Sequence, residues 1–254
     1  MARSYQTRLS PPYLKQVRLR HDVELDRSLY PFDLPLLRDR EFTLRFDRAI
    51  TVMVGENGVG KSTLLEGIAA MAGFDQAGGG PGYRPLDHST AAERNGDTLR
   101  DVLRASWLPK IGQSWFFRAE SFFSVSRYLD LAAREAGGSG PEFLSHSDGE
   151  GFLRFFAERC TRPGIFLFDE PESALSPRRQ FEFVRLLRDI AAAGKAQVIV
   201  ATHSPILMAT PGATLLSVTR GGIDPVALED TDHYRLYREF VLDPHGTIEA
   251  MIGA

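Results

Sequence analysis

The stretch from Gly55 to Thr63 limits the possible folds of this chain more than any other, because it follows a phosphate-binding pattern. It matches G-x-x-x-x-G-K-S and lies between an apolar run at 49–54, which predicts a buried strand, and residues 62–71, which predict a helix. Backbone amides at the start of such a helix form a nest for polyphosphate oxygens. The sequence therefore predicts a nucleotide-binding loop composed of Gly55, Glu56, Asn57, Gly58, Val59, Gly60, Lys61, Ser62 and Thr63.

Two side chains of this loop have separate predicted roles. The Lys61 ammonium is expected to reach the β and γ phosphates, and the Ser62 hydroxyl is expected to ligate Mg²⁺. A glycine-rich turn with a solvated lysine is the alternative. The acidic strand end at 169–170, described below, favours the nucleotide site.

Composition and charge exclude several classes of protein. The 254 residues can bury a substantial core, in one elaborated domain or in two. A net charge of −3 excludes a polycation, although the first twenty residues are basic and form either a phosphate-facing patch or a solvated terminus. The single cysteine, Cys160, excludes an intrachain disulfide. Because the sequence has neither a signal-peptide segment nor an apolar run of roughly 18 residues, a cytoplasmic location is expected.

The order of predicted strands and helices indicates an α/β fold. The N-terminal half predicts strands over 13–19 and 41–54, a mobile loop over 73–97, a helix over 98–105 and an aromatic strand over 114–117. The C-terminal half predicts apolar strands over 165–168 and 196–200, an intervening helix over 177–193, antiparallel strands over 213–218 and 225–228, and a closing helix over 231–242. Such a succession forms a mostly parallel central sheet flanked by helices, with right-handed crossovers.

Two carboxylates follow the apolar strand at 165–168. The strand would carry Asp169 to the edge of the sheet, where it can hold Mg²⁺ through water, and Glu170 is placed to orient or deprotonate the water that attacks the γ phosphate. His203 follows the next apolar strand. An acidic turn and a satisfied buried histidine are the alternatives, and the phosphate loop upstream favours the catalytic roles.

The order of these motifs resembles the ATP-binding-cassette (ABC) ATPase superfamily over most of the chain. Asp169 and Glu170 are similar to its Walker B carboxylates, residues 172–176 to its D-loop, and His203 to its switch histidine. The resemblance implies ATP and Mg²⁺ as ligands, with Glu170, His203 and Lys61 as catalytic residues. It also implies one ABC-type domain over the whole chain, with an antiparallel N-terminal β-subdomain and a helical subdomain at about residues 98–160.

Residues 144–150 look like a divergent form of the signature loop that contacts nucleotide in this superfamily. Either Ser145 or Ser147 can align with the signature serine. We favour Ser147, because Ser147, Gly149 and Glu150 match the S-x-G-E form of chromosome-maintenance and recombination-repair ATPases. The S-H-G-E-like run and the D-E-P-E-x-A-L-S-P stretch are also similar to small bacterial "predicted ATPases".

Two positions depart from the pattern of the superfamily. Ser176 stands where the D-loop ends in aspartate, and Arg118-Ala119-Glu120 occupies the place of the Q-loop glutamine. Glu120 can still hold metal-bound water, so it is a candidate metal residue beside Ser62 and Asp169. The residue that recognises adenine stays open among Tyr13, Val17 and Arg18, for which core or surface roles are the alternatives.

The resemblance implies that two copies must meet, because the signature loop of one subunit closes over the phosphate held by the other. We therefore expect an ATP-driven homodimer with two-fold symmetry. One hypothesis is a soluble switch that acts on nucleic acid or on a partner enzyme, in repair or defence. The alternatives are the nucleotide-binding subunit of a membrane transporter and a nucleotide-sensing interaction module with negligible turnover.

Overall fold

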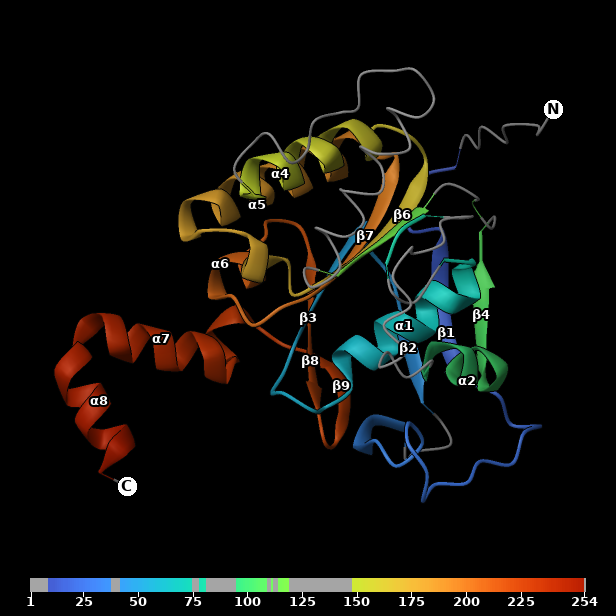
Figure 1. The fold of residues 1–254 in the computed structure, drawn as a ribbon, viewed down its shortest axis with the longest axis horizontal. Coiled ribbons are helices and arrows are strands. Elements are labelled where there is room, and N and C mark those ends of the chain that lie inside the picture. The colour runs from blue at the N-terminus through green and yellow to red at the C-terminus, as the bar shows by residue number, and fades with distance from the viewer. Residues whose placement is uncertain are drawn as a thin grey trace.

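The computed structural model describes residues 9–37, 42–74, 78–80, 95–108, 111, 114–118 and 148–253. These residues form a six-stranded central sheet, a three-stranded antiparallel sheet and helices on both faces of the central sheet (Figure 1). The predicted α/β fold, mostly parallel with an antiparallel N-terminal sheet, is confirmed.

The central sheet has the strand order β5-β6-β7-β3-β8-β9. Its strands are β3 (Ile50–Val54), β5 (Ser114–Arg118), β6 (Gly164–Asp169), β7 (Ala196–Ala201), β8 (Thr214–Thr219) and β9 (Gly222–Pro225). The first five in this order are parallel, and β9 runs antiparallel to β8. Because β6, β7 and β3 are neighbours and run parallel, the loops after these three strands meet at one edge of the sheet.

The N-terminal sheet has the order β2-β1-β4 and covers one face of the central sheet together with a long helix. Its strands are β1 (Leu14–Leu19), β2 (Thr43–Arg45) and β4 (Leu103–Trp107), and the helix is α1 (Lys61–Ala72). One apolar cluster joins all of them: Val17, Leu44 and Leu103 from the sheet contact the same core as Leu65 of α1. This cluster fixes α1, and therefore the loop before it, against the sheet.

The opposite face of the central sheet carries α4 (Asp148–Arg159), α5 (Pro177–Ala193) and α6 (Pro205–Met208) (Figure 1). Aromatic rings fill the space between these helices and the strands. Phe117 and Phe168 are stacked with centroids 5.2 Å apart, and Phe168 lies 5.0 Å from Phe183 of α5. The predicted bounds of α5 are confirmed, because Ser176 caps its start and Gly194, with φ 60°, ends it.

Several predicted boundaries are wrong. The helix expected over 98–105 is α2 (Asn95–Val102), and the residues after it form β4. The segment 41–54 is divided into β2 and β3. β4 and β5 are strands of the two sheets. The helical subdomain expected at about residues 98–160 stays a prediction. Of the expected mobile loop over 73–97, Gly79 pairs with Phe116 and α2 begins at Asn95, while 81–94 lie outside the described residues.

The C-terminal part also differs from the prediction. β8 pairs parallel with β3 as well as antiparallel with β9. The strand expected over 225–228 lies earlier, as β9. The expected closing helix is α7 (Asp232–Leu242), which α8 (Pro244–Ile252) follows. These two helices project from the body of the molecule (Figure 1) and contain no buried residue. None of the helices described is both long and apolar enough to cross a membrane.

Three short 3-10 turns complete the described residues: η1 (Pro35–Leu37), η3 (Pro171–Ala174) and η4 (Leu228–Asp230). η3 follows β6 directly, and η4 leads into α7. Each of these two turns therefore places residues near the edge of the sheet at which β3, β6 and β7 end.

Candidate nucleotide site

The phosphate loop connects β3 to α1, as predicted. Gly58 and Gly60 have φ values of 77° and 99°, which side chains with a Cβ rarely adopt. A Cβ on Gly60 would also lie 2.3 Å from Leu36 of η1. The glycines are therefore required for the path of the loop, which turns its backbone into the first turn of α1.

Lys61 lies at the centre of the site and is 4% exposed. Its ammonium donates to the carbonyl oxygens of Gly55 and Glu56 at 2.7 and 3.0 Å, and it lies 3.0 Å from His203 Nε2. These three acceptors match the three N–H groups of an ammonium. Burial lowers the pKa of Lys61, an effect that the carboxylate of Glu170 opposes.

Ser62 and Asp169 meet at the edge of the sheet. The Ser62 hydroxyl donates to Asp169 Oδ1 at 2.9 Å, and Asp169, the last residue of β6, is 7% exposed. Hydroxyl and carboxylate oxygens are suitable ligands for Mg²⁺, which usually binds one or two protein oxygens and takes the rest from phosphate and water. No cluster of three metal-ligating His, Cys, Asp or Glu side chains occurs in the described part of the chain.

Arg118 lies beside this pair, at the end of β5. Its Nη1 is 2.7 Å from Glu66 Oε1 of α1, and its Nε is 3.7 Å from Asp169 Oδ2. Arg118, at the place where the resemblance predicts the Q-loop, therefore sets a cation against the carboxylate predicted to hold the metal. Sequence reasoning noted the arginine but not this contact.

Glu170 has a backbone conformation that is rare for residues other than glycine. Its φ is 47° and ψ 53°, and its carbonyl accepts hydrogen bonds from the backbone and hydroxyl of Ser173 at 3.1 and 2.6 Å. The side chain stays 45% exposed, with Oε1 at 3.5 Å from His203 Nε2. Left-handed backbone of this kind is concentrated at functional sites. The bend turns the Glu170 carboxylate toward the lysine and the histidine.

His203 follows β7 and joins three parts of the site. Its backbone N–H donates to Glu172 Oε1 of η3 at 2.6 Å, and its Nδ1 lies 3.0 Å from His233 Nε2 of α7. Burial lowers the pKa of His203, and the Lys61 ammonium lowers it further, whereas Glu170 raises it. Burial raises the pKa of Glu172. Burial and the Lys61 ammonium therefore both favour the neutral form of the His203 imidazole.

Two residues of the site were missed by sequence reasoning. Tyr30 OH lies 2.7 Å from Thr63 Oγ1, and Tyr30 lines a small cavity with the loop lysine and serine. His233 comes from a polar helix with no local signal of function. Tyr13 and Val17, considered for adenine recognition, are buried in the core, and Tyr13 OH donates to Lys195 O at 2.8 Å, so neither can stack on a base.

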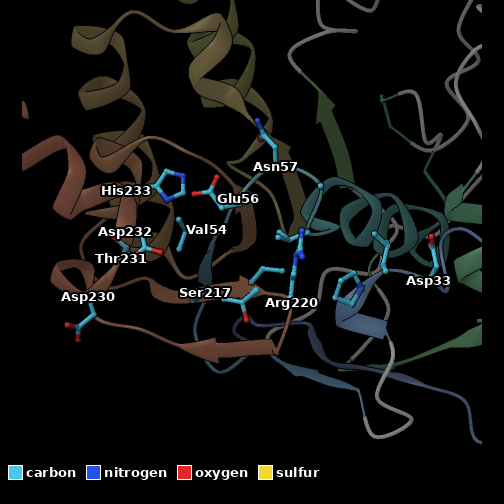
Figure 2. Close-up of a pocket in the computed structure, with 17 residues that line it drawn as sticks. Asp33, Val54, Glu56, Asn57, Ser217, Arg220, Asp230, Thr231, Asp232 and His233 are labelled. Atoms are coloured by element: carbon cyan, nitrogen blue, oxygen red, sulfur yellow. The ribbon is translucent and has the colours of Figure 1, made fainter. Parts of the chain in front are cut away.

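A larger groove of about 700 Å³ lies along the outer side of the phosphate loop (Figure 2). Its walls are the loop residues 54–59, the end of β8 with Arg220, and the residues 230–233 that lead into α7. In Figure 2, His233 and Glu56 face each other across this groove. The start of α7 therefore forms one wall beside the phosphate loop.

The remaining predicted residues are not placed in the site by the structure. Ser147 and Glu120 lie outside the described residues. Gly149 and Glu150 belong to the first turn of α4 by their backbone. The assignments of these four residues stay predictions.

Comparisons with known proteins give two family matches. Residues 124–209 match the family described as "AAA domain, putative AbiEii toxin, Type IV TA system", and residues 31–98 match the one described as "AAA domain". The thiamine import ATP-binding protein ThiQ of Cereibacter sphaeroides is 31% identical over 193 residues, which are 68% of this chain and 80% of that protein. The chain belongs to the ABC-type P-loop ATPases.

Three further known proteins are similar to this ABC-type ATPase. ThiQ of Photobacterium profundum is 31% identical over 182 residues, covering 61% of this chain and 68% of that protein. An ATP-binding protein of Brucella abortus is 26% identical over 219 residues, and the match spans 76% of this chain but 59% of that protein. The solved structure of cbiO1 from Clostridium perfringens covers 83% of this chain and 91% of that one at 17% identity, with a TM-score of 0.41. The relatives named as ATP-binding proteins support ATP binding by this chain.

Proposed function

We propose that this ABC-type ATPase hydrolyses ATP to ADP and phosphate in a Mg²⁺-dependent reaction. The carrying observation is that residues after three neighbouring parallel strands meet at one edge of the sheet: Lys61 lies 3.0 Å from His203 Nε2, and Ser62, the next residue, donates to Asp169. Glu170 lies beside them. A nucleotide-binding turn without chemistry would not require this convergence.

Each side chain has a role that its position allows. The Lys61 ammonium neutralises phosphate charge, and the backbone amides of the loop donate to phosphate oxygens. The exposed Glu170 carboxylate accepts a proton from the attacking water. Ser62 and Asp169 would hold Mg²⁺, which supplies further neutralisation of phosphate charge. His203 donates from Nε2 to the γ phosphate once that nitrogen carries a proton.

The proposed reaction takes place in a homodimer. One chain carries one phosphate loop and one signature-like segment at 144–150, and the family pattern places the signature of one copy against the nucleotide of the other. ATP would join two copies with two-fold symmetry, and loss of the γ phosphate would release them. The protein would act as a soluble switch on nucleic acid or on a partner enzyme.

A second candidate is the nucleotide-binding subunit of a membrane transporter. Its support is the 31% identity to two proteins named for thiamine import. Co-purification with a membrane protein would favour it, whereas ATPase activity that DNA stimulates and salt suppresses steeply would favour the switch.

The test is ATP hydrolysis and mass measurement by light scattering with four proteins. Glu170→Gln should retain ATP binding, lose turnover and accumulate as a dimer in ATP, and Lys61→Ala should lose ATP binding. Glu158→Gln, at a glutamate that is 55% exposed on α4, is the matched control and should behave as the wild type. A wild type that turns over ATP at full rate as a monomer would contradict the dimer, and full turnover by Glu170→Gln would contradict its catalytic role.

A further inference from the structure

We propose that His233 is a positioning residue for His203, and that through it the nucleotide site is coupled to the C-terminal helices α7 and α8. The inference rests on the proposed function of His203. The two imidazoles are joined directly, with His203 Nδ1 at 3.0 Å from His233 Nε2, ring centroids 5.2 Å apart and ring planes at 44°. The contact links two segments that are separated by 30 residues in sequence.

The neighbours of His203 determine which nitrogen carries its proton. An ammonium can only donate hydrogen bonds, so His203 Nε2, at 3.0 Å from Lys61 Nζ, must accept. In a neutral imidazole the proton is then on Nδ1. Nδ1 therefore donates to His233, whose Nε2 must be the acceptor. The hydrogen bonds form a directed series from Lys61 through His203 to His233.

A histidine in this position can do what a carboxylate cannot. When the lysine ammonium is engaged by phosphates, His203 Nε2 must carry a proton in order to donate to the γ phosphate. A carboxylate on Nδ1 could only accept, so His203 would have to become a cation. A second histidine can either accept or donate. When the His203 Nδ1 proton passes to His233 Nε2, His233 Nδ1 releases a proton and His203 Nε2 takes one up, so His203 can present Nε2–H while both rings stay neutral.

The position of His233 is fixed by the start of α7. Thr231 caps the helix by accepting from the Tyr234 backbone N–H at 3.2 Å, and its hydroxyl donates to Leu228 O at 2.8 Å. Arg235, one turn into the helix, donates to the Asp230 carboxylate at 2.8 Å. The first turn of α7 is thus tied to η4. A displacement of the His233 ring would therefore also displace the start of α7.

The two helices α7 and α8, which follow this first turn, are suited to transmit such a displacement. Neither α7 nor α8 contains a buried residue, and eight of their large apolar side chains are exposed. They are Leu236, Tyr237, Phe240, Val241, Leu242, Ile248, Met251 and Ile252. Because so little packing restrains them, α7 and α8 can move when the first turn of α7 is displaced.

Three variants test the role of His233. His233→Phe keeps a ring but loses both nitrogens, His233→Gln keeps a donor and an acceptor, and His245→Phe makes the same change at an exposed histidine of α8. We expect His233→Phe to lower kcat for ATP by about tenfold or more with KM within about twofold, because the imidazole is misoriented and binding is retained. His233→Gln should restore most of kcat, and His245→Phe should match the wild type.

Nuclear magnetic resonance gives a measurement that does not depend on turnover. In the nucleotide-free wild type the His203 ring should show a slowly exchanging Nδ1–H, and with a non-hydrolysable ATP analogue the proton should move to Nε2. In His233→Phe the Nδ1–H should exchange rapidly. Circular dichroism is the control that each variant is folded.

The outcomes separate this inference from the proposed function. If the wild type hydrolyses ATP and His233→Phe retains its kcat and its protected Nδ1–H, the positioning role is wrong and the ATPase stands. If the wild type has no turnover but the Nδ1–H is protected and depends on His233, the ATPase proposal fails and the histidine pair stands. Equal loss of kcat in His245→Phe would also overturn the inference.

Discussion

The side-chain amide of Gln197 in β7 binds the backbone of Leu14 in β1 through both of its ends. Oε1 accepts from Leu14 N at 2.8 Å, and Nε2 donates to Leu14 O at 3.0 Å; Oε1 also accepts from Tyr13 N at 2.8 Å. Gln197 has no exposed surface. One buried amide therefore joins the central sheet to the antiparallel sheet.

Gln197→Leu should destabilise the protein strongly. It leaves buried backbone groups of Tyr13 and Leu14 without this partner, so we expect the free energy of unfolding to fall by roughly 2–4 kcal/mol. Urea denaturation measures the change. Gln16→Leu, at a half-buried position of β1, is the control and should change the free energy by less than about 1 kcal/mol. Equal urea denaturation midpoints for Gln197→Leu and Gln16→Leu would contradict the predicted contribution of this amide to stability.

Arg118 should compete with the metal for Asp169. Its guanidinium lies between Glu66 and Asp169, whose side chains are 10% and 7% exposed. Arg118→Met should lower the free energy of unfolding by about 2 kcal/mol, because nearly buried carboxylates lose a cation. The same loss should reduce the Mg²⁺ concentration needed for half-maximal ATPase activity. Arg188→Met, at an arginine that is 62% exposed on α5, is the control. An unchanged or higher Mg²⁺ requirement in Arg118→Met would contradict the competition.

His203 should contribute to the pH dependence of stability. Its pKa is lowered from 6.5, so below pH 6.5 the unfolded chain binds a proton that the folded protein resists. The contribution to stability is therefore present above pH 6.5 and is lost as the pH falls toward the lowered value. The titratable groups that face the ring are Lys61, Glu56, Glu170 and His233.

The effect of His203 can be isolated by substitution. Glu172 acts in the opposite direction, since burial raises its pKa from 4.5 and its ionisation in the folded protein costs stability as the pH rises above that value. Denaturation of the wild type and of His203→Gln at pH 5 to 7.5 isolates the histidine. The free energy of unfolding of the wild type minus that of His203→Gln should grow with pH across this range. A difference independent of pH would contradict the lowered pKa.

Cys160 should be unreactive in the folded protein. It lies at the end of α4 and is 4% exposed, and burial raises its pKa to about 12. At pH 8 its thiolate fraction is then roughly a thousandfold lower than that of a free cysteine. Alkylation by iodoacetamide should occur only as fast as the protein opens. The same protein in guanidinium is the control, and rapid alkylation under native conditions would contradict the buried thiol.

The elements that sequence reasoning placed correctly carry their signals locally. Ser176, Pro177 and Gly194 mark both ends of α5 within a few residues of those ends. The phosphate loop and the carboxylates after β6 are likewise contiguous in sequence. For such segments the chain itself contains the information that determines the structure.

The features that were missed depend on distant contacts. β4 follows α2 without a break, and it is a strand because it pairs with β1, more than eighty residues earlier in the chain. The direction of β8 is determined by β3. His233 acquires its role by contact with His203, and Tyr30 by contact with Thr63. No pattern in the neighbouring sequence of these residues encodes the pairing.

The left-handed backbone at Glu170 implies a trade-off between activity and stability at that position. A glycine there would relieve the conformational cost of φ 47°, so Glu170→Gly should be harder to unfold than the wild type while it is inactive. An inactive protein that melts at a higher temperature cannot owe its inactivity to misfolding. The Glu170→Gly variant can therefore separate the loss of a catalytic group from the loss of the fold.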